Sequence, residues 1–196
     1  MPGKPTQHGG VRGLVLTPGA SAGRDQPALV AIDRAVSATG VTVERIDFPY
    51  RLQGRRAPDK APVLVAAADS AARALAHALD VPQDAIALGG RSMGGRMCSM
   101  AVAEGLPAAA LILVSYPLHP PGRPENARTA HFDGIGVPCL FVSGTRDAFG
   151  TPDELVAATA TIPGEVTHVW IEGGDHGLRG KDERVAESVV TWLRER

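Results

Sequence analysis

Residues 85–96 read AIALGGRSMGGR, and this stretch decides how the rest of the chain is interpreted. The apolar run Ala85–Gly89 is typical of a buried strand, and a helix is expected over Met93–Glu104. Between them, Gly90-Arg91-Ser92-Met93-Gly94 fits the G-x-S-x-G pattern of a sharp strand-to-helix turn that exposes a nucleophilic serine. We expect its glycines to allow a strained backbone that holds the Ser92 hydroxyl above a sheet.

The pentapeptide is not specific by itself, because a chain with 23 glycines in 196 residues produces it by chance roughly one time in ten. Its position between an apolar strand and a helix favours a catalytic turn over a glycine-rich turn with an idle serine. The same position places Ser92 at a helix N-terminus, where the helix dipole stabilises developing negative charge.

Short apolar runs alternate with longer amphipathic segments on both sides of this turn. Strands are expected at residues 11–17, 41–48, 85–89, 109–115, 139–143 and 166–171, and helices at 25–39, 63–79, 93–104, from 151 and from about 182. The helix from Thr151 opens with a capping box that has proline at its first position. Such alternation predicts an α/β fold with a parallel sheet of about six strands and helices on both faces.

Length and composition fit a single globular domain, residues 1–196, with residues 1–10 as a flexible tail. The chain is 44% hydrophobic and 21% charged, which is ordinary for a globular protein. Its net charge of -1 provides no field to attract nucleic acid or an anionic membrane. The N-terminus lacks an apolar signal core and no stretch has transmembrane length, so we expect a cytoplasmic protein.

The two cysteines, Cys98 and Cys139, each lie in an apolar segment. This placement predicts buried, reduced thiols rather than a disulfide framework. No Cys/His spacing resembles that of a metal site, so neither a metal nor another cofactor is expected. The expected partner is a small-molecule substrate.

A serine hydroxyl is a poor nucleophile until a base takes its proton, so a histidine is required. His176 follows the last expected strand, in a loop at the edge of the sheet where parallel folds bind ligands, and it fits the chain order Ser, acid, His. His119 also occupies a loop at that edge but is less well placed for this order. The remaining histidines lie in the tail, on a helix, before a strand or inside a strand: His8, His77, His131 and His168.

Asp147 follows the penultimate strand and is the candidate for the acid that orients His176 and stabilises its imidazolium form. Asp175 is adjacent to His176 in sequence, but neighbouring side chains in a turn usually diverge. Asp133 lies on the wrong side of its strand. The sequence therefore predicts a triad of Ser92, His176 and Asp147.

An oxyanion hole usually combines the backbone N–H after the nucleophile with one from the loop after the first core strand. The first of these belongs to Met93. The loop after the first strand spans residues 17–23, and Ala20 is the candidate there, with Ser21 as the alternative.

Five blocks of sequence resemble a known family: Leu14–Ala20, Asp47–Arg51, Gly89–Arg96, Tyr116–Gly122 and Gly144–Asp147. They are similar to the small α/β-hydrolases near the dienelactone-hydrolase group, in a poorly characterised subset that includes a subunit of a chromatin-modifying complex. The resemblance spans residues 11–193 and implies the α/β-hydrolase fold with the Ser92, Asp147, His176 triad.

Two departures from the family pattern matter. Pro18 stands where many relatives carry the histidine of a His-Gly oxyanion motif, which leaves the geometry of that hole open. Dienelactone hydrolases proper use a cysteine where this chain has Ser92, which argues against a dienelactone substrate.

The segment between Ser115 and Cys139 is short and rich in proline, too short for a helical cap domain. We therefore expect an open, shallow site with Tyr116, Leu118 and His119 at its rim. The polar loop 51–56 should also lie at this edge. Its three arginines, Arg51, Arg55 and Arg56, are candidates together with Arg91 for attracting an acidic substrate, and a solvated basic loop is the alternative.

Together these features predict a serine hydrolase that cleaves an ester or thioester of a small acyl group through an acyl-enzyme. A catalytically inactive protein-interaction module of the same fold is the alternative. Transfer of the acyl group to an acceptor other than water is a third interpretation.

Overall fold

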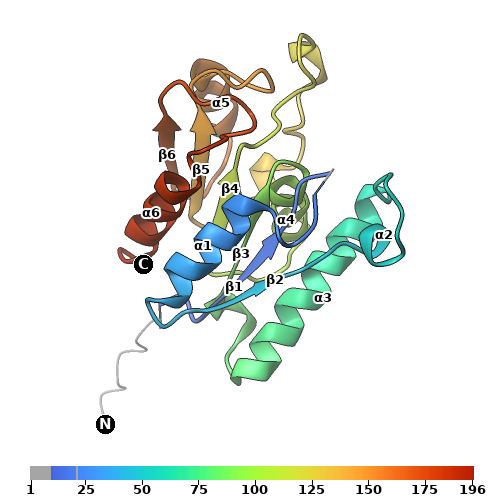
Figure 1. Cartoon of the computed structure of the whole chain (residues 1–196), viewed down its shortest axis with the longest axis vertical. Coiled ribbons are helices and arrows are strands. Elements are labelled where there is room, and N and C mark those ends of the chain that lie inside the picture. The colour runs from blue at the N-terminus through green and yellow to red at the C-terminus, as the bar shows by residue number, and fades with distance from the viewer. Residues whose placement is uncertain (1–9, 21) are drawn as a thin grey trace.

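The computed structural model describes residues 10–20 and 22–196, so the expected N-terminal tail lies outside the described residues except for Gly10. Six strands form one sheet in the order β2-β1-β3-β4-β5-β6 (Figure 1). All neighbouring strands are parallel, which confirms the predicted sheet. The strands are β1 (Gly13–Thr17), β2 (Thr42–Arg45), β3 (Ile86–Arg91), β4 (Leu111–Val114), β5 (Cys139–Gly144) and β6 (Val166–Ile171).

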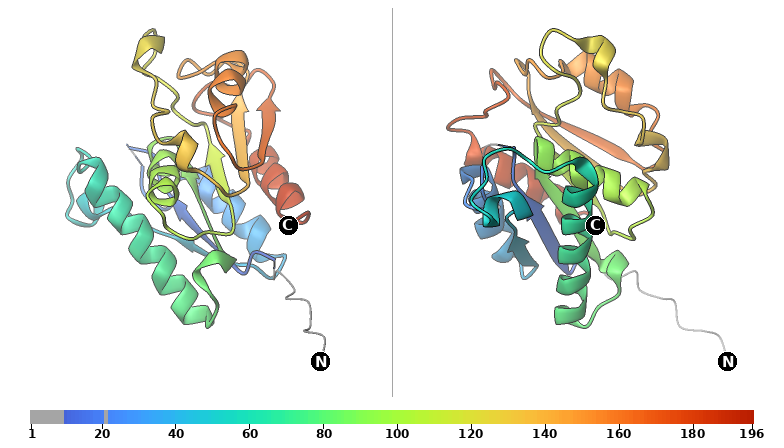
Figure 2. Two further views of the ribbon diagram at one scale, coloured as in Figure 1. Left: turned by 180° about the vertical axis from the view of Figure 1, so that it is seen from behind. Right: turned by 90° about the vertical axis from the view of Figure 1, so that its right-hand side faces the viewer.

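Helices cover both faces of the sheet (Figures 1 and 2). Helices α1 and α6 pack together on one face, and α3, α4 and α5 share the core on the other. The helices are α1 (Pro27–Ser37), α2 (Pro49–Leu52), α3 (Ala61–Leu79), α4 (Met93–Ala103), α5 (Pro152–Thr159) and α6 (Asp182–Leu193).

The core has two halves because successive side chains of a strand point to opposite faces. In β1, Leu14 and Leu16 pack with α1 and α6, whereas Val15 packs with α3 and α4. All five residues of β1 are buried, as expected for a strand that is covered on both sides. The apolar runs of the sequence therefore correspond to the central strands of this sheet.

Two predicted boundaries were wrong, both near proline. The expected strand 41–48 ends at Arg45, and the expected loop after it contains α2 and the first residues of α3. Each of these helices carries proline in its first turn, Pro49 in α2 and Pro62 in α3. Proline suits that position because its fixed φ is helical. It lacks a backbone N–H, but an N–H in the first turn has no acceptor within the helix, so nothing is lost.

The predicted capping box at the start of α5 is confirmed. The Glu154 N–H donates to Thr151 Oγ1 at 3.4 Å, and the Thr151 N–H donates to Glu154 Oε2 at 2.8 Å. Between β4 and β5 the described chain forms only two short 3-10 turns, η2 (Pro124–Asn126) and η3 (Phe132–Gly134), and no cap. No helix within residues 10–20 and 22–196 has the length and apolar character needed to cross a bilayer.

Candidate active site

The turn between β3 and α4 holds Ser92 in a conformation that side chains rarely adopt. Its φ is 52° and its ψ is -118°, so the strained backbone predicted from the glycine pattern is confirmed. A Cβ on Gly90 would lie 2.6 Å from the Thr17 carbonyl oxygen, and one on Gly94 would lie 2.5 Å from the same atom. Glycine at both positions therefore lets the end of β1 pack directly against the turn.

Gly90→Ala is expected to lower the free energy of unfolding by about 1–3 kcal/mol, because the methyl group overpacks against backbone that cannot move aside. Urea denaturation measures this change. Gly136→Ala is the matched control, since a Cβ there meets nothing within 4 Å. Equal stability of the two variants would show that the close approach at Gly90 is not a constraint.

Three side chains from distant parts of the chain meet above this turn. Ser92 Oγ lies 2.9 Å from His176 Nε2, and His176 Nδ1 lies 2.8 Å from Asp147 Oδ2 and 3.0 Å from Asp147 Oδ1. The Asp147 side chain is 2% exposed and that of His176 is 20% exposed. The backbone N–H of Phe149 donates to Asp147 Oδ1 at 2.8 Å, which fixes the carboxylate.

The fold brings these residues together because each follows the carboxyl end of a strand. Ser92 follows β3, Asp147 follows β5 and His176 follows β6, and parallel strands end at one edge of the sheet. The Asp147 and His176 loops are also joined directly, because the Arg146 N–H donates to the Gly174 carbonyl oxygen at 2.8 Å. The distance between acid and base is thus set by backbone contacts.

Two further residues hold the base in place. The Phe149 ring stacks on the His176 imidazole with centroids 4.0 Å apart and an interplanar angle of 28°. The Arg91 guanidinium donates to the backbone carbonyl oxygen of His176. The sequence analysis did not predict that Phe149 contacts the base. Its position two residues after the predicted acid, in the same loop, could have indicated that it lies near the site.

The candidate oxyanion residues border the same pocket as Ser92. Met93 is the first residue of α4, and Ala20 lies in the loop after β1. Two contacts hold this loop: Tyr50 Oη donates to the Ala20 carbonyl oxygen at 2.7 Å, and the Gly19 N–H donates to Gln26 Oε1 at 3.1 Å. The alternative at position 21 lies outside the described residues.

The pocket above Ser92 has a volume of about 420 Å³. This volume is near the lower end of the range typical of small-molecule sites. Its lining combines Ser92 and His176 of the proposed triad with the candidate oxyanion residues and three arginines: Gly19, Ala20, Arg91, Ser92, Met93, Arg96, Pro117, Arg128, Phe149 and His176.

The expected rim residues Tyr116, Leu118 and His119 do not line this pocket, and that prediction was wrong. They are only 2%, 3% and 6% exposed, because the chain after β4 turns these side chains into the protein. Tyr116 packs against Phe132 and its Oη donates to the Arg128 carbonyl oxygen at 2.8 Å. Their neighbour Pro117 lines the pocket instead.

The arginines are also distributed differently from the prediction. Arg91 lines the pocket, whereas Arg51 is exposed on α2 and borders a separate hollow beside Asp47. Arg96 and Arg128 line the pocket and were missed. Arg96 had a signal, since it lies in the first turn of the helix that follows Ser92, but Arg128 lies in a loop without periodicity.

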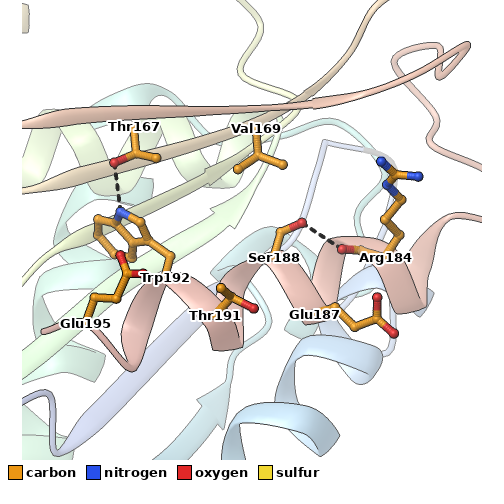
Figure 3. Close-up of a pocket in the computed structure, with 8 residues that line it drawn as sticks. All are labelled: Thr167, Val169, Arg184, Glu187, Ser188, Thr191, Trp192 and Glu195. Carbon is orange, nitrogen blue, oxygen red and sulfur yellow. Dashed lines mark hydrogen bonds between the residues drawn. The ribbon is translucent and has the colours of Figure 1, made fainter.

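A second hollow, of about 450 Å³, lies between β6 and α6 (Figure 3). Trp192 Nε1 donates to Thr167 Oγ1 across it at 3.0 Å, and Ser188 Oγ donates to the Arg184 carbonyl oxygen at 2.8 Å. None of its described lining residues is a histidine, cysteine or aspartate. The pocket above Ser92, by contrast, has a serine hydroxyl within hydrogen-bond distance of a histidine.

Two of the other described histidines form contacts away from this pocket. His131 Nε2 lies 2.8 Å from Ser99 Oγ, and His168 Nε2 lies 2.9 Å from Thr159 Oγ1. Burial, together with the charge of Arg96, lowers the pKa of His131 to about 4, so this imidazole is neutral at pH 7. Among residues 10–20 and 22–196, no group of three or more His, Cys, Asp or Glu side chains is arranged to hold a metal ion.

Comparison with known proteins agrees with this architecture. Residues 11–192 match the alpha/beta hydrolase domain family. An alpha-beta serine hydrolase homologue from Coxiella burnetii is 20% identical with a TM-score of 0.75, over 92% of this chain and 84% of that chain. Est1E from Butyrivibrio proteoclasticus is 20% identical with a TM-score of 0.74, over 97% and 90%.

A dienelactone hydrolase from Anabaena variabilis is 18% identical with a TM-score of 0.76, over 96% of this chain and 88% of that chain. At such identities the solved structures share the fold with this chain, and they carry no conclusion about its substrate. The family match covers nearly all of the described residues.

Proposed function

The chain belongs to the alpha/beta hydrolase family, and from that premise we propose that it is a serine hydrolase cleaving a carboxylic ester or thioester of a small acyl group. The observation that carries the proposal is the continuous set of contacts from Ser92 Oγ through His176 to the buried Asp147 carboxylate. In a reactive serine site, nucleophile and base lie within hydrogen-bond reach and a third group orients the base.

In the proposed reaction His176 Nε2 takes the Ser92 proton while Oγ attacks the carbonyl carbon of the substrate. The Met93 and Ala20 N–H groups donate to the tetrahedral oxyanion, and Asp147 stabilises the imidazolium. His176 then gives its proton to the departing alcohol or thiol, which leaves an acyl-enzyme on Ser92. Water attacks this ester as His176 takes its proton, and the carboxylic acid departs as the proton returns to Ser92 Oγ.

The size of the pocket supports a small acyl group. About 420 Å³ is available above Ser92, and Phe149 and Pro117 close part of its wall with rigid side chains. The described chain between β4 and β5 adds no helical cap that would extend the pocket into a tunnel. A long acyl chain would therefore leave much of its apolar surface in water, where it gains little binding energy.

A fluorophosphonate probe is expected to label Ser92 covalently, because it reacts with a serine that an adjacent histidine has activated. Mass spectrometry of the digested protein identifies the modified peptide. Ser188→Ala is the control and should label like the wild type, since Ser188 lies on α6 and bonds only to backbone. A folded wild-type protein that resists the probe would favour the inactive interaction module. Labelling that persists in Ser92→Ala would reject Ser92 as the reactive residue.

A further inference from the structure

Three arginines line the pocket above Ser92, and the described lining contains no aspartate or glutamate. One of them, Arg91, has a partner in the carbonyl oxygen of His176. The other two, Arg96 and Arg128, reach the pocket from α4 and from the loop before β5. The pocket therefore carries more positive charge than the proposed acyl transfer uses.

Arg96 and Arg128 have no acidic partner in the described part of the chain. No ion pair within 4.0 Å involves either of them. Residues 1–9 and 21 contain no aspartate or glutamate, so they hold no acidic side chain that could serve. The buried Nε of Arg96 has no hydrogen-bond partner, and the guanidinium of Arg128 reaches only the Pro117 carbonyl oxygen, at 3.3 Å.

The two charges also act on each other. Burial and the charge of Arg96 together lower the pKa of Arg128, and the same two causes lower that of His131. Two partly buried cations placed close together without an anion oppose folding, because neither water nor a counter-charge fully stabilises them. Such an arrangement is typical of a site that an anionic ligand completes.

We propose that Arg96 and Arg128 bind a carboxylate of the substrate, so that the enzyme acts on esters or thioesters that carry a carboxylate near the scissile bond. This inference rests on the proposed hydrolase function and specifies its substrate class. Guanidinium groups suit the role because their planar array of donors matches the two oxygens of a carboxylate.

The helix geometry limits where this carboxylate lies. Arg96 lies in the first turn of α4, where its N–H donates to the Ser92 carbonyl oxygen at 3.1 Å, and both residues line the same pocket. An extended arginine side chain then reaches a group a few bonds from the attacked carbonyl carbon. A substrate with a short chain between its carbonyl and its carboxylate fits a pocket of about 420 Å³.

Two pairs of esters test the inference. Mono-4-nitrophenyl adipate and 4-nitrophenyl hexanoate have acyl chains of equal length that end in a carboxylate and a methyl group, respectively. The second pair, 4-acetoxybenzoate and 4-acetoxybenzamide, places the charge on the leaving group. For at least one pair we expect the wild type to prefer the anionic ester by about tenfold or more in kcat/KM.

Arg96→Gln and Arg128→Gln are each expected to reduce that preference by about tenfold, since each removes one charged donor. Arg123→Gln is the matched control, because it removes an exposed charge from the same loop as Arg128 and should keep the preference. A purely structural role would lower kcat/KM for both esters of a pair in parallel and leave their ratio unchanged. An absent preference in both pairs, or a ratio unchanged in both pocket variants, overturns the inference while the hydrolase function stands.

A binding measurement separates the two proposals if no ester is hydrolysed. Adipate itself should then raise the Tm of the wild type and of Arg123→Gln but not that of Arg96→Gln. That result would retain the anion site and reject the hydrolase function. No stabilisation by adipate, in a protein that hydrolyses none of the esters, would reject both.

Discussion

Ser92→Ala is expected to lower kcat toward 4-nitrophenyl acetate by on the order of 10⁴-fold or more, because it removes the atom that forms the acyl-enzyme. His176 and the backbone donors of Met93 and Ala20 stay in the pocket, so a small residual rate above that of water is compatible with the mechanism. Continuous release of 4-nitrophenolate measures the loss, with purified protein at a concentration high enough to detect the residual activity.

The control for this variant addresses folding. Residue 92 has a positive φ, and alanine is strained there much as serine is, so the unfolding curve should change little. Ser188→Ala should keep the wild-type kcat, because its side chain lies on α6 beside the second hollow. Retained activity in folded Ser92→Ala would reject Ser92 as the nucleophile.

The elements that position these residues were predictable because their signals are local. Buried strands such as β4 and β5 appear as apolar runs, and the glycines around Ser92 mark the strained turn between β3 and α4. The edge of a parallel sheet then collects whatever follows each strand. This rule predicts Asp147 and His176 as candidates from their positions after two of the strands.

The pocket wall was much less predictable, because it depends on how a loop packs. Nothing in the proline-rich sequence after β4 distinguishes Pro117, which faces the pocket, from Tyr116 and Leu118, which enter the core. The burial of Tyr116 depends on Phe132 and Phe141, which come from later in the chain. Turn chemistry predicts where such a loop bends but not which of its side chains point inward.

The same limit explains the two missed arginines. A sequence shows charge but not whether an acidic partner folds beside it; Arg45, for example, pairs with Asp33 at 2.8 Å. Only the folded chain reveals that Arg96 lies at the pocket without such a partner among the described residues. Whether a charged side chain at a site lacks an oppositely charged partner can therefore be learned from the structure but not from the sequence.

Asp147→Asn is expected to lower kcat by about 10⁴-fold while leaving the fold intact. The amide has the size of the carboxylate and can still accept the Phe149 N–H through its oxygen. It carries no charge to stabilise the imidazolium, and its NH₂ group favours the tautomer with the proton on Nε2. In that tautomer His176 cannot accept the Ser92 proton, so the nucleophile stays protonated. The rate of ester hydrolysis measures the effect.

Asp175→Asn is the matched control, since Asp175 is the acid next to His176 in sequence. Its Oδ1 accepts the Leu178 N–H at 3.0 Å, which is a turn contact rather than a contact with the base. Its loss should therefore change kcat far less than the loss of the charge at Asp147. If Asp175→Asn were the inactive variant and Asp147→Asn the active one, the acid would have been assigned to the wrong loop. The measured ratio of the two rates thus tests whether contact in space or adjacency in sequence identifies the partner of His176.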